Sequence, residues 1–207
     1  VLFFQSVHSD GVLVNMTRVT KLSGVNAKDL TSAEFEAHKQ VEIVENFLKK
    51  YIPGFENARL RCVAAMTGVR ESRRIVGVQT LTSDMVINSS EHKDSVAICA
   101  FPIDIHDPVG SELNWIRKKK ICCYDIPYGT MVPQKLTNLL VTGRCISATH
   151  EALASARISA TAMALGQAAG LAASLSVQEK KACQDISVEK LQNLLEKHGA
   201  VPGKKWL

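Results

Sequence analysis

The sequence predicts an α/β (α+β) fold, in which helices cover a mixed sheet, on three observations. Segments with strand patterns and helix patterns alternate along the 207 residues, without an internal repeat or a low-complexity linker. Residues 31–51 carry the apolar periodicity of one helix face. A short run at residues 138–142, apolar from Leu139 to Val141, ends before Gly143 and leads into a long segment of small residues, which is typical of a buried strand, a loop and a helix.

The N-terminal elements are predicted as a hairpin followed by a helix. Two strand-like segments, 1–6 and 11–19, flank a turn at residues 9–11. Thr31 is the predicted N-cap of the helix, and Glu34 three residues later would complete a capping box. Apolar residues then recur every three or four positions, and Pro53–Gly54 ends the helix.

The middle of the chain predicts strands at residues 58–66 and 95–103, each with side chains of alternating character. Residues 104–110 are rich in Asp, Pro and Gly, which predicts a turn. Residues 124–132 fit no regular element and are interpreted as irregular.

The C-terminal third predicts a buried parallel strand at residues 138–142 and a long helix at about 155–174. A last helix should begin after the N-cap Ser187 and end at Gly199.

Composition favours a globular protein that buries a full core, because 46% of the residues are hydrophobic and 22% are charged. The net charge of +5 is modest and aromatic residues make up only 5%. A nucleic-acid-binding surface would show a longer basic stripe with interleaved aromatic residues. The basic run 117–120 is interpreted as a solvated loop, with a phosphate or anion contact as the alternative.

The cysteines and the acidic residues predict no metal site. None of the six cysteines has CxxC spacing, and no paired histidines stand nearby, which argues against zinc and favours reduced thiols in a cytosolic protein. Asp104, His106 and Asp107 could in principle bind a metal. They fall beside Pro108 on a predicted turn, where aspartate commonly stabilises the turn itself.

The first residues of the sequence do not have the pattern of a signal peptide. The first residues lack a basic region and an initiator Met and begin within a strand pattern, so we expect a further element before Val1. Arg157, Gln167 and many Ala and Ser residues interrupt the apolar character of the small-residue helix, so no membrane span is predicted there. The expected location is cytoplasmic.

The small-residue helix would allow a close approach. Ala162, Gly166, Gly170 and Ser174 stand four apart, on one helix face. A helix N-terminus at the carboxyl edge of a parallel sheet carries unpaired N–H groups and favours anions or an electron-rich carbonyl. A tight helix–sheet contact without any ligand explains the same pattern equally well.

Four motifs follow one another in the chain: GVRESRRIVG (68–77), PIDIHDP (102–108), YDIPYGTMVP (124–133) and NLLVTGRCISATHEALASARISATAMALGQAAG (138–170). In this order they resemble the C-terminal half of the FAD-dependent oxidoreductase family of glutathione-reductase-like flavoproteins. The resemblance extends from about Val12 to Leu195. The family's N-terminal GxGxxG segment, which holds the pyrophosphate of FAD, does not occur in this sequence.

The resemblance implies that the loop and helix start within residues 143–158 approach FAD. Gly143 would close the strand. The first turn of the helix would direct its positive end at the flavin, through Ser155, Ala156, Arg157 and Ile158. Arg144 stands where many relatives carry an acidic residue that contacts the sugar-like chain of the cofactor, so that contact would differ here.

His150, Arg70 and Arg73 are the candidate catalytic residues. His150 lies in the loop that would face the flavin and suits proton transfer near neutral pH, with a merely solvated histidine as the alternative. Arg70 and Arg73 could bind a carboxylate substrate or the flavin edge. The equal alternative is an Arg–Glu network around Glu71 at a strand end.

Four further residues lie in or near these motifs. Cys145 is interpreted as a small buried hydrophobe, because no second cysteine stands at CxxC spacing. Tyr124, Asp125 and Tyr128 are candidates for lining a pocket.

The sequence thus predicts a substrate-side or cap region at residues 1–135 and the C-terminal part of an FAD-binding domain at 136–207. The chain would be the C-terminal portion of an FAD-dependent oxidoreductase, inactive on its own because the pyrophosphate loop is missing. The alternative is a non-catalytic anion-binding or assembly module. Expected partners are a small-molecule substrate, an N-terminal FAD-binding segment and a second copy in a homo-oligomer, with no nucleic acid and no membrane.

Overall fold

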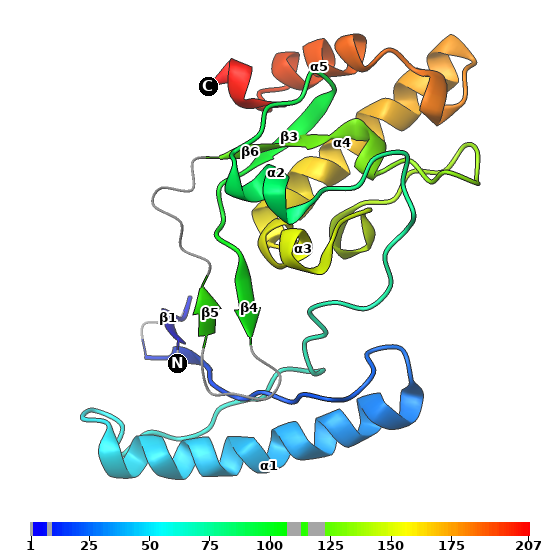
Figure 1. The fold of residues 1–207 in the computed structure, drawn as a ribbon. Coiled ribbons are helices and arrows are strands. Elements are labelled where there is room, and N and C mark those ends of the chain that lie inside the picture. The colour runs from blue at the N-terminus through cyan, green and yellow to red at the C-terminus, as the bar shows by residue number, and fades with distance from the viewer. Residues whose placement is uncertain (1, 8–9, 107–112, 116–122) are drawn as a thin grey trace. The chain divides into compact units, whose positions relative to one another are not determined.

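The fold was analysed in a computed structural model, which describes residues 2–7, 10–106, 113–115 and 123–207. The chain divides into two compact units, Val1–Val69 and Arg70–Leu207 (Figure 1). This division separates two groups of residues that each pack mainly among themselves. The predicted boundary between residues 135 and 136 separates a substrate-side region from part of an FAD-binding domain, and it stays a prediction.

The N-terminal unit contains the predicted hairpin and helix. Strands β1 (Leu2–Gln5) and β2 (Val12–Asn15) pair antiparallel, although the second strand is shorter than predicted. Helix α1 (Ala27–Tyr51) follows, and its N-cap is Asn26, whose side chain accepts hydrogen bonds from two backbone N–H groups of the first turn.

Two predictions for this unit are wrong. Thr31 lies inside α1 and its hydroxyl donates to the carbonyl of Ala27, while Glu34 accepts from the backbone N–H of Thr67, so there is no capping box. Asn26 caps the helix instead, with Asp29 in the first turn beside the positive helix end. Residues 58–66 form no strand, because no described strand lies beside them to complete a ladder.

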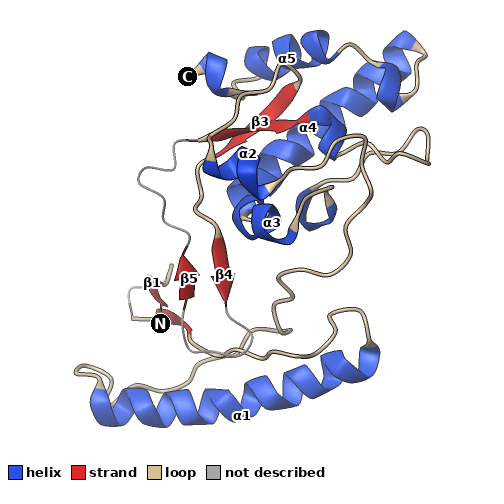
Figure 2. Cartoon of the chain, viewed as in Figure 1, coloured by secondary structure: helices blue, strands red, loops and turns tan. Residues whose placement is uncertain are grey.

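The C-terminal unit combines small antiparallel sheets with helices, which confirms the α+β class (Figure 2). Its sheets are β3 (Ser95–Cys99) with β6 (Tyr124–Pro127), and β4 (Asp104–His106) with β5 (Leu113–Trp115). Its helices are α2 (Ser83–Ile87), α3 (His150–Ala156), α4 (Ser159–Glu179) and α5 (Val188–Lys197).

The strand predictions for this unit hold in part. The predicted strand at 95–103 ends at Cys99, and the first three residues of the predicted turn form β4. Residues 107–110 and the basic run 117–120 lie outside the described residues. Residues 124–132 are more regular than predicted, because β6 is followed by a 3-10 turn, Tyr128–Thr130.

The predicted parallel strand at residues 138–142 is wrong. Leu139 is 42% exposed, and a hydrogen bond of 2.9 Å from the Val141 N–H to the Met131 carbonyl is the backbone contact of this segment. A buried parallel strand needs neighbours on its edges and cover on both faces. Every pair of named strands among the described residues is antiparallel, and the parallel bridge between Leu81 and Ala148 does not include residues 138–142.

Helix α4 is the central helix of the C-terminal unit (Figure 1). It packs against β3 and α5, and it buries Leu165, Ala168 and Ala172 completely. The predicted stripe of small residues is not its packing face, because Gly166 and Gly170 are exposed and a Cβ added to either would meet no atom within 4 Å. Gly166 and Gly170 therefore lie on an open face of α4, whereas Ala168 and Ala172 lie on its packing face.

Two further features of the helices bear on the predictions. Among the described helices, α4 is long and apolar enough to cross a membrane by length and composition alone, and the expectation that it spans no membrane stays a prediction. It begins after Arg157, which therefore does not interrupt it. The predicted last helix is confirmed as α5, with Ser187 as N-cap and Gly199 at φ +76° beyond its end.

Candidate functional site

Three of the sequence motifs lie side by side in the C-terminal unit. Residues 75–81 run between residues 129–134 and residues 145–149, with backbone hydrogen bonds to both. The bonds that define this ladder measure 2.8 to 3.1 Å from N to O: Val78 to Val132, Gln79 to Gly129, Ile75 to Cys145, Leu81 to Ser147, and Thr149 to Leu81. Segments far apart in sequence are thereby held in one layer.

Gly77 makes this close approach possible. A Cβ at this position would lie 2.6 Å from the Cβ of Ser147 and 2.9 Å from the carbonyl oxygen of Gly129. These distances are far inside van der Waals contact, so any side chain would push the three segments apart.

At the start of this ladder, Glu71 holds two basic side chains. Its Oε2 lies 2.7 Å from Nδ1 of His150, and its Oε1 forms an ion pair with Nη1 of Arg74 at 2.9 Å. The Glu71 side chain is 17% exposed, whereas that of His150 is 57% exposed. His150 is the first residue of α3, whose N-cap Thr149 accepts from the N–H of Ala152. The His150 imidazole therefore extends from a hydrogen-bonded helix start, and more than half of its surface is exposed.

A second carboxylate, that of Asp104 on β4, lies between two arginines. Its Oδ2 is 3.5 Å from Nη1 of Arg70 and 3.8 Å from Nη2 of Arg157, which also donates to the Asp104 carbonyl at 3.1 Å. Arg157 is 14% exposed, and burial, together with the charge of Arg70, lowers its pKa. The Asp104 carboxylate opposes this and favours the charged guanidinium.

We call these six residues the Arg–carboxylate cluster: Arg70, Glu71, Arg74, Asp104, His150 and Arg157. They come from the first, second and fourth motifs, and the third motif is hydrogen-bonded to the first through the ladder. The predicted Arg–Glu network is thus present at Arg74, while Arg70 is paired with Asp104 instead.

The remaining predicted residues of the loop lie on the surface. Arg73 is exposed and has no ion-pair partner among the described residues. Gly143 has φ +68° and Arg144 is exposed, and both belong to a 3-10 turn, Gly143–Cys145, which packs beside α4. Cys145 is exposed, so the interpretation as a buried hydrophobe is wrong.

The predicted start of the long helix is also wrong. Residues 155–158 close α3 and lead into α4: Arg157 is the C-cap of α3, and Ile158, in extended conformation, is the N-cap of α4. Thr149 caps a separate short helix, and α4 begins at Ser159, with Ser159 and Ala160 exposed and Thr161 buried.

Ser155 and Ala156 are buried at the end of α3. The Ser155 hydroxyl lies 2.7 Å from the hydroxyl of Tyr124 and donates to the carbonyl of Phe101. Their predicted cofactor contact stays a prediction, and in this structure they support the site from the core.

The tyrosines of the third motif are mainly core residues. Tyr124 and Asp125 are buried, and Tyr128, also buried, donates to the carbonyl of Cys183 at 2.7 Å. Burial raises the pKa of both tyrosines above the usual range, so both are neutral hydrogen-bonding groups. Of the three, Tyr128 also lines a small hollow of 140 Å³ with Gln79 and Val132.

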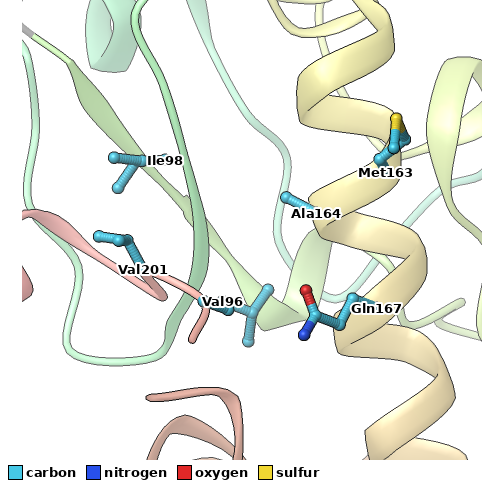
Figure 3. A pocket seen from close by; sticks show the side chains of 7 residues that line it. Val96, Ile98, Met163, Ala164, Gln167 and Val201 are labelled. Atoms are coloured by element: carbon cyan, nitrogen blue, oxygen red, sulfur yellow. The ribbon is translucent and has the colours of Figure 1, made fainter. Parts of the chain in front are cut away.

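A larger hollow of 580 Å³ lies between β3, α4 and residues 200–201 (Figure 3). Its lining is apolar apart from Gln167: Val96, Ile98, Met163, Ala164, Gln167, Ala200 and Val201. Its lining contains no titratable side chain and none of the cluster residues.

Sequence reasoning missed the two carboxylates as organisers of the site. Glu71 was weighed only as part of a network, and Asp104 only as a turn residue or metal ligand. The available signal was an acidic residue inside an arginine-rich motif, a pattern that favours ion pairing.

A family model described as FAD dependent oxidoreductase matches residues 2–195. The chain belongs to the FAD-dependent oxidoreductase family. The match extends over both units and includes all four motifs, which confirms the resemblance at the family level. No curated protein and no solved structure matched the chain.

The described residues fit part of an FAD site. The loop at Gly143 is open, because no atom lies within 4 Å of where its Cβ would be, and a flat ring system could approach its backbone. The loop packs beside α4, whose first two residues are exposed and whose N-cap makes no side-chain hydrogen bond to the first turn. Such a helix start favours an electron-rich carbonyl or an anion.

Proposed function

We propose that this chain forms the flavin-facing and substrate-side part of an FAD-dependent oxidoreductase that acts on a small carboxylate. The observation that carries the proposal is the convergence of motifs: segments characteristic of the family meet at the Arg–carboxylate cluster, and the hydrogen bond from Ile75 to Cys145 joins the first motif to the loop that contains Gly143. FAD, when bound, would accept or deliver a hydride.

The residues of this chain would share the remaining tasks. Gly143 and Arg144 would contact the cofactor from the loop, with Arg157 and Ile158 at the junction before the exposed start of α4. His150 would take up or return the proton that accompanies hydride movement, since imidazole changes charge near neutral pH. Arg73, exposed and unpaired among the described residues, and Arg70, held at 3.5 Å by Asp104, would bind the substrate carboxylate.

A second candidate is a module that binds no FAD and uses the arginines for anion binding or assembly. The absence of a GxGxxG segment from the 207 residues favours it for this chain taken alone. The cytoplasmic location, the homo-oligomer and the absence of nucleic-acid and membrane partners stay predictions of the sequence.

The first test is spectroscopic. A parent protein that includes an N-terminal FAD-binding segment should purify with flavin absorbance or regain it with added FAD, whereas FAD titrated into the 207-residue chain should not bind at micromolar concentration. A folded parent protein that stays colourless and cannot be reconstituted would overturn the proposal.

The second test addresses the residues. Anaerobic flavin reduction by a panel of small carboxylic acids and their methyl esters should favour the acids. H150Q should slow reduction by about 100-fold, the usual contribution of one acid–base group, while R73M should mainly weaken the dependence on the free carboxylate. Equal rates for acids and esters would contradict the assigned substrate class.

A further inference from the structure

We infer that Glu71 is a positioning residue: it holds the neutral His150 ring with its proton on Nδ1 and leaves Nε2 as the ring atom that exchanges protons. The inference deepens the proposed function and rests on it for its purpose, since His150 is the proton-transfer group proposed there. The structural claim itself concerns only side chains of this chain.

The hydrogen bond dictates the tautomer. Nδ1 of His150 lies 2.7 Å from Oε2 of Glu71, a short charge-assisted distance. A carboxylate only accepts, so Nδ1 must be the donor. A neutral imidazole carries a single N–H proton, so Nε2 then presents its lone pair. Nε2 makes no hydrogen bond to the described residues, and it belongs to a side chain that is 57% exposed.

Other contacts hold both partners of this hydrogen bond in place. Glu71 is largely buried, and its other oxygen pairs with Arg74 at 2.9 Å. Its segment continues into the ladder, where Ile75 donates to the carbonyl of Cys145 at 3.0 Å. His150 follows Thr149, whose N–H donates to the carbonyl of Leu81 at 2.8 Å at the other end of the same ladder. Glu71 and His150, which lie 79 positions apart in the sequence, therefore belong to segments that are hydrogen-bonded to each other.

An incidental surface ion pair would look different. Such pairs join two long, mobile side chains in solvent and contribute little to stability. Here the Glu71 side chain is only 17% exposed, its two oxygens contact two different residues, and the histidine lies at a capped helix start. The arrangement matches the general way in which a carboxylate orients a functional imidazole and selects its tautomer.

The test is a tautomer measurement by NMR on the 207-residue chain with ¹⁵N-labelled histidine, which needs no flavin and no substrate. The His150 signals are assigned by their loss in H150Q. At a pH where the ring is neutral, the wild-type chain should show the Nδ1–H form. In E71L the ratio of Nδ1–H to Nε2–H should fall about tenfold, the loss expected for a hydrogen bond to a charged group.

R74M is the matched control, because it removes the other partner of Glu71 without touching the imidazole. It should leave the tautomer ratio unchanged. If E71L does not fold because Arg74 is left without its carboxylate, the double variant E71L/R74M removes both charges and should show the same tenfold fall. A wild-type Nε2–H form, or an unchanged ratio in the folded E71L or double variant, would overturn the inference.

The two proposals fail separately. A tautomer shift in E71L together with a parent protein that binds no FAD would contradict the proposed function and leave the positioning role of Glu71 intact. If the parent protein binds flavin and H150Q slows its reduction, but the tautomer ratio does not change in E71L, the positioning role of Glu71 is contradicted and the proposed function is not.

Discussion

The two units of the molecule use long helices in opposite ways. Helix α1 has 25 residues, yet only Ala33 and Leu48 among them are buried, while Phe35 is 69% and Ile43 66% exposed. Helix α4 has 21 residues and lies against β3 and α5, with residues such as Leu165 wholly buried. A helix therefore contributes to a core only where a second layer covers it. The candidate site is built on the unit that has such layers.

The largest expected effect contrasts the two helices directly. Leu165→Ala should lower the free energy of unfolding of the C-terminal unit by about 3 kcal/mol, because it leaves a cavity among fully buried side chains. Ile43→Ala on the exposed face of α1 should change stability by less than about 0.5 kcal/mol. Urea unfolding followed by circular dichroism measures both. Comparable losses would show that α1 buries its apolar face as α4 does.

The next effect concerns the ladder. Gly77→Ala should destabilise the C-terminal unit by about 2 kcal/mol, because the added methyl group meets Ser147 and two backbone carbonyls at once. Gly166→Ala is the control within the same unit: its Cβ meets no atom within 4 Å in α4, and it should stabilise by up to about 1 kcal/mol. Thermal unfolding of both variants measures the difference. A neutral Gly77→Ala would mean that the three segments are not in close contact.

A smaller effect separates buried from exposed tyrosine hydroxyls. Tyr124→Phe removes a buried hydrogen bond of 2.7 Å to Ser155 and should cost about 1 kcal/mol. Tyr51→Phe at the end of α1, where the ring is largely exposed, should be silent. Chemical unfolding of the pair checks this, and equal effects would argue against the buried Tyr124–Ser155 contact.

The smallest effect tests a charge in the N-terminal unit. A backbone hydrogen bond from Thr67 lowers the pKa of Glu34 below its ordinary value of 4.5. Its stabilising contribution should therefore be complete above about pH 5 and be lost as the pH falls below 4.5 through the lowered value. The NMR shift of the Thr67 amide should titrate with a midpoint below 4.5, and this titration should vanish in Glu34→Gln. Glu56→Gln should leave it intact.

Local signals in the sequence predicted the elements that depend on local contacts. The hairpin at the N-terminus and helix α5 with Ser187 as its cap follow from turn chemistry, periodicity and capping. The start of α1 was misplaced because Asn26 and Thr31 are both good caps, and only the structure decides between them.

Features that depend on distant partners could not be predicted. The apolar run at 138–142 reads as a parallel strand, but pairing requires neighbours that no local pattern reveals. For the candidate site, the motifs predicted that His150 and Arg70 matter. They could not show that Glu71 and Asp104 hold them, because these contacts join residues far apart in the chain.

That separation has a kinetic consequence. Thr80 and Ser147 lie 67 positions apart and Glu71 and His150 lie 79 apart, whereas α4 and α5 can form from contacts within a few residues. Closing such long loops is entropically costly and slow. During synthesis, residues 70–81 emerge well before their partners at 145–150, so they have nothing to pair with. A chain interrupted before that point carries Arg70 and Arg74 but not His150 or Arg157, so the Arg–carboxylate cluster assembles only when folding of this unit is nearly complete.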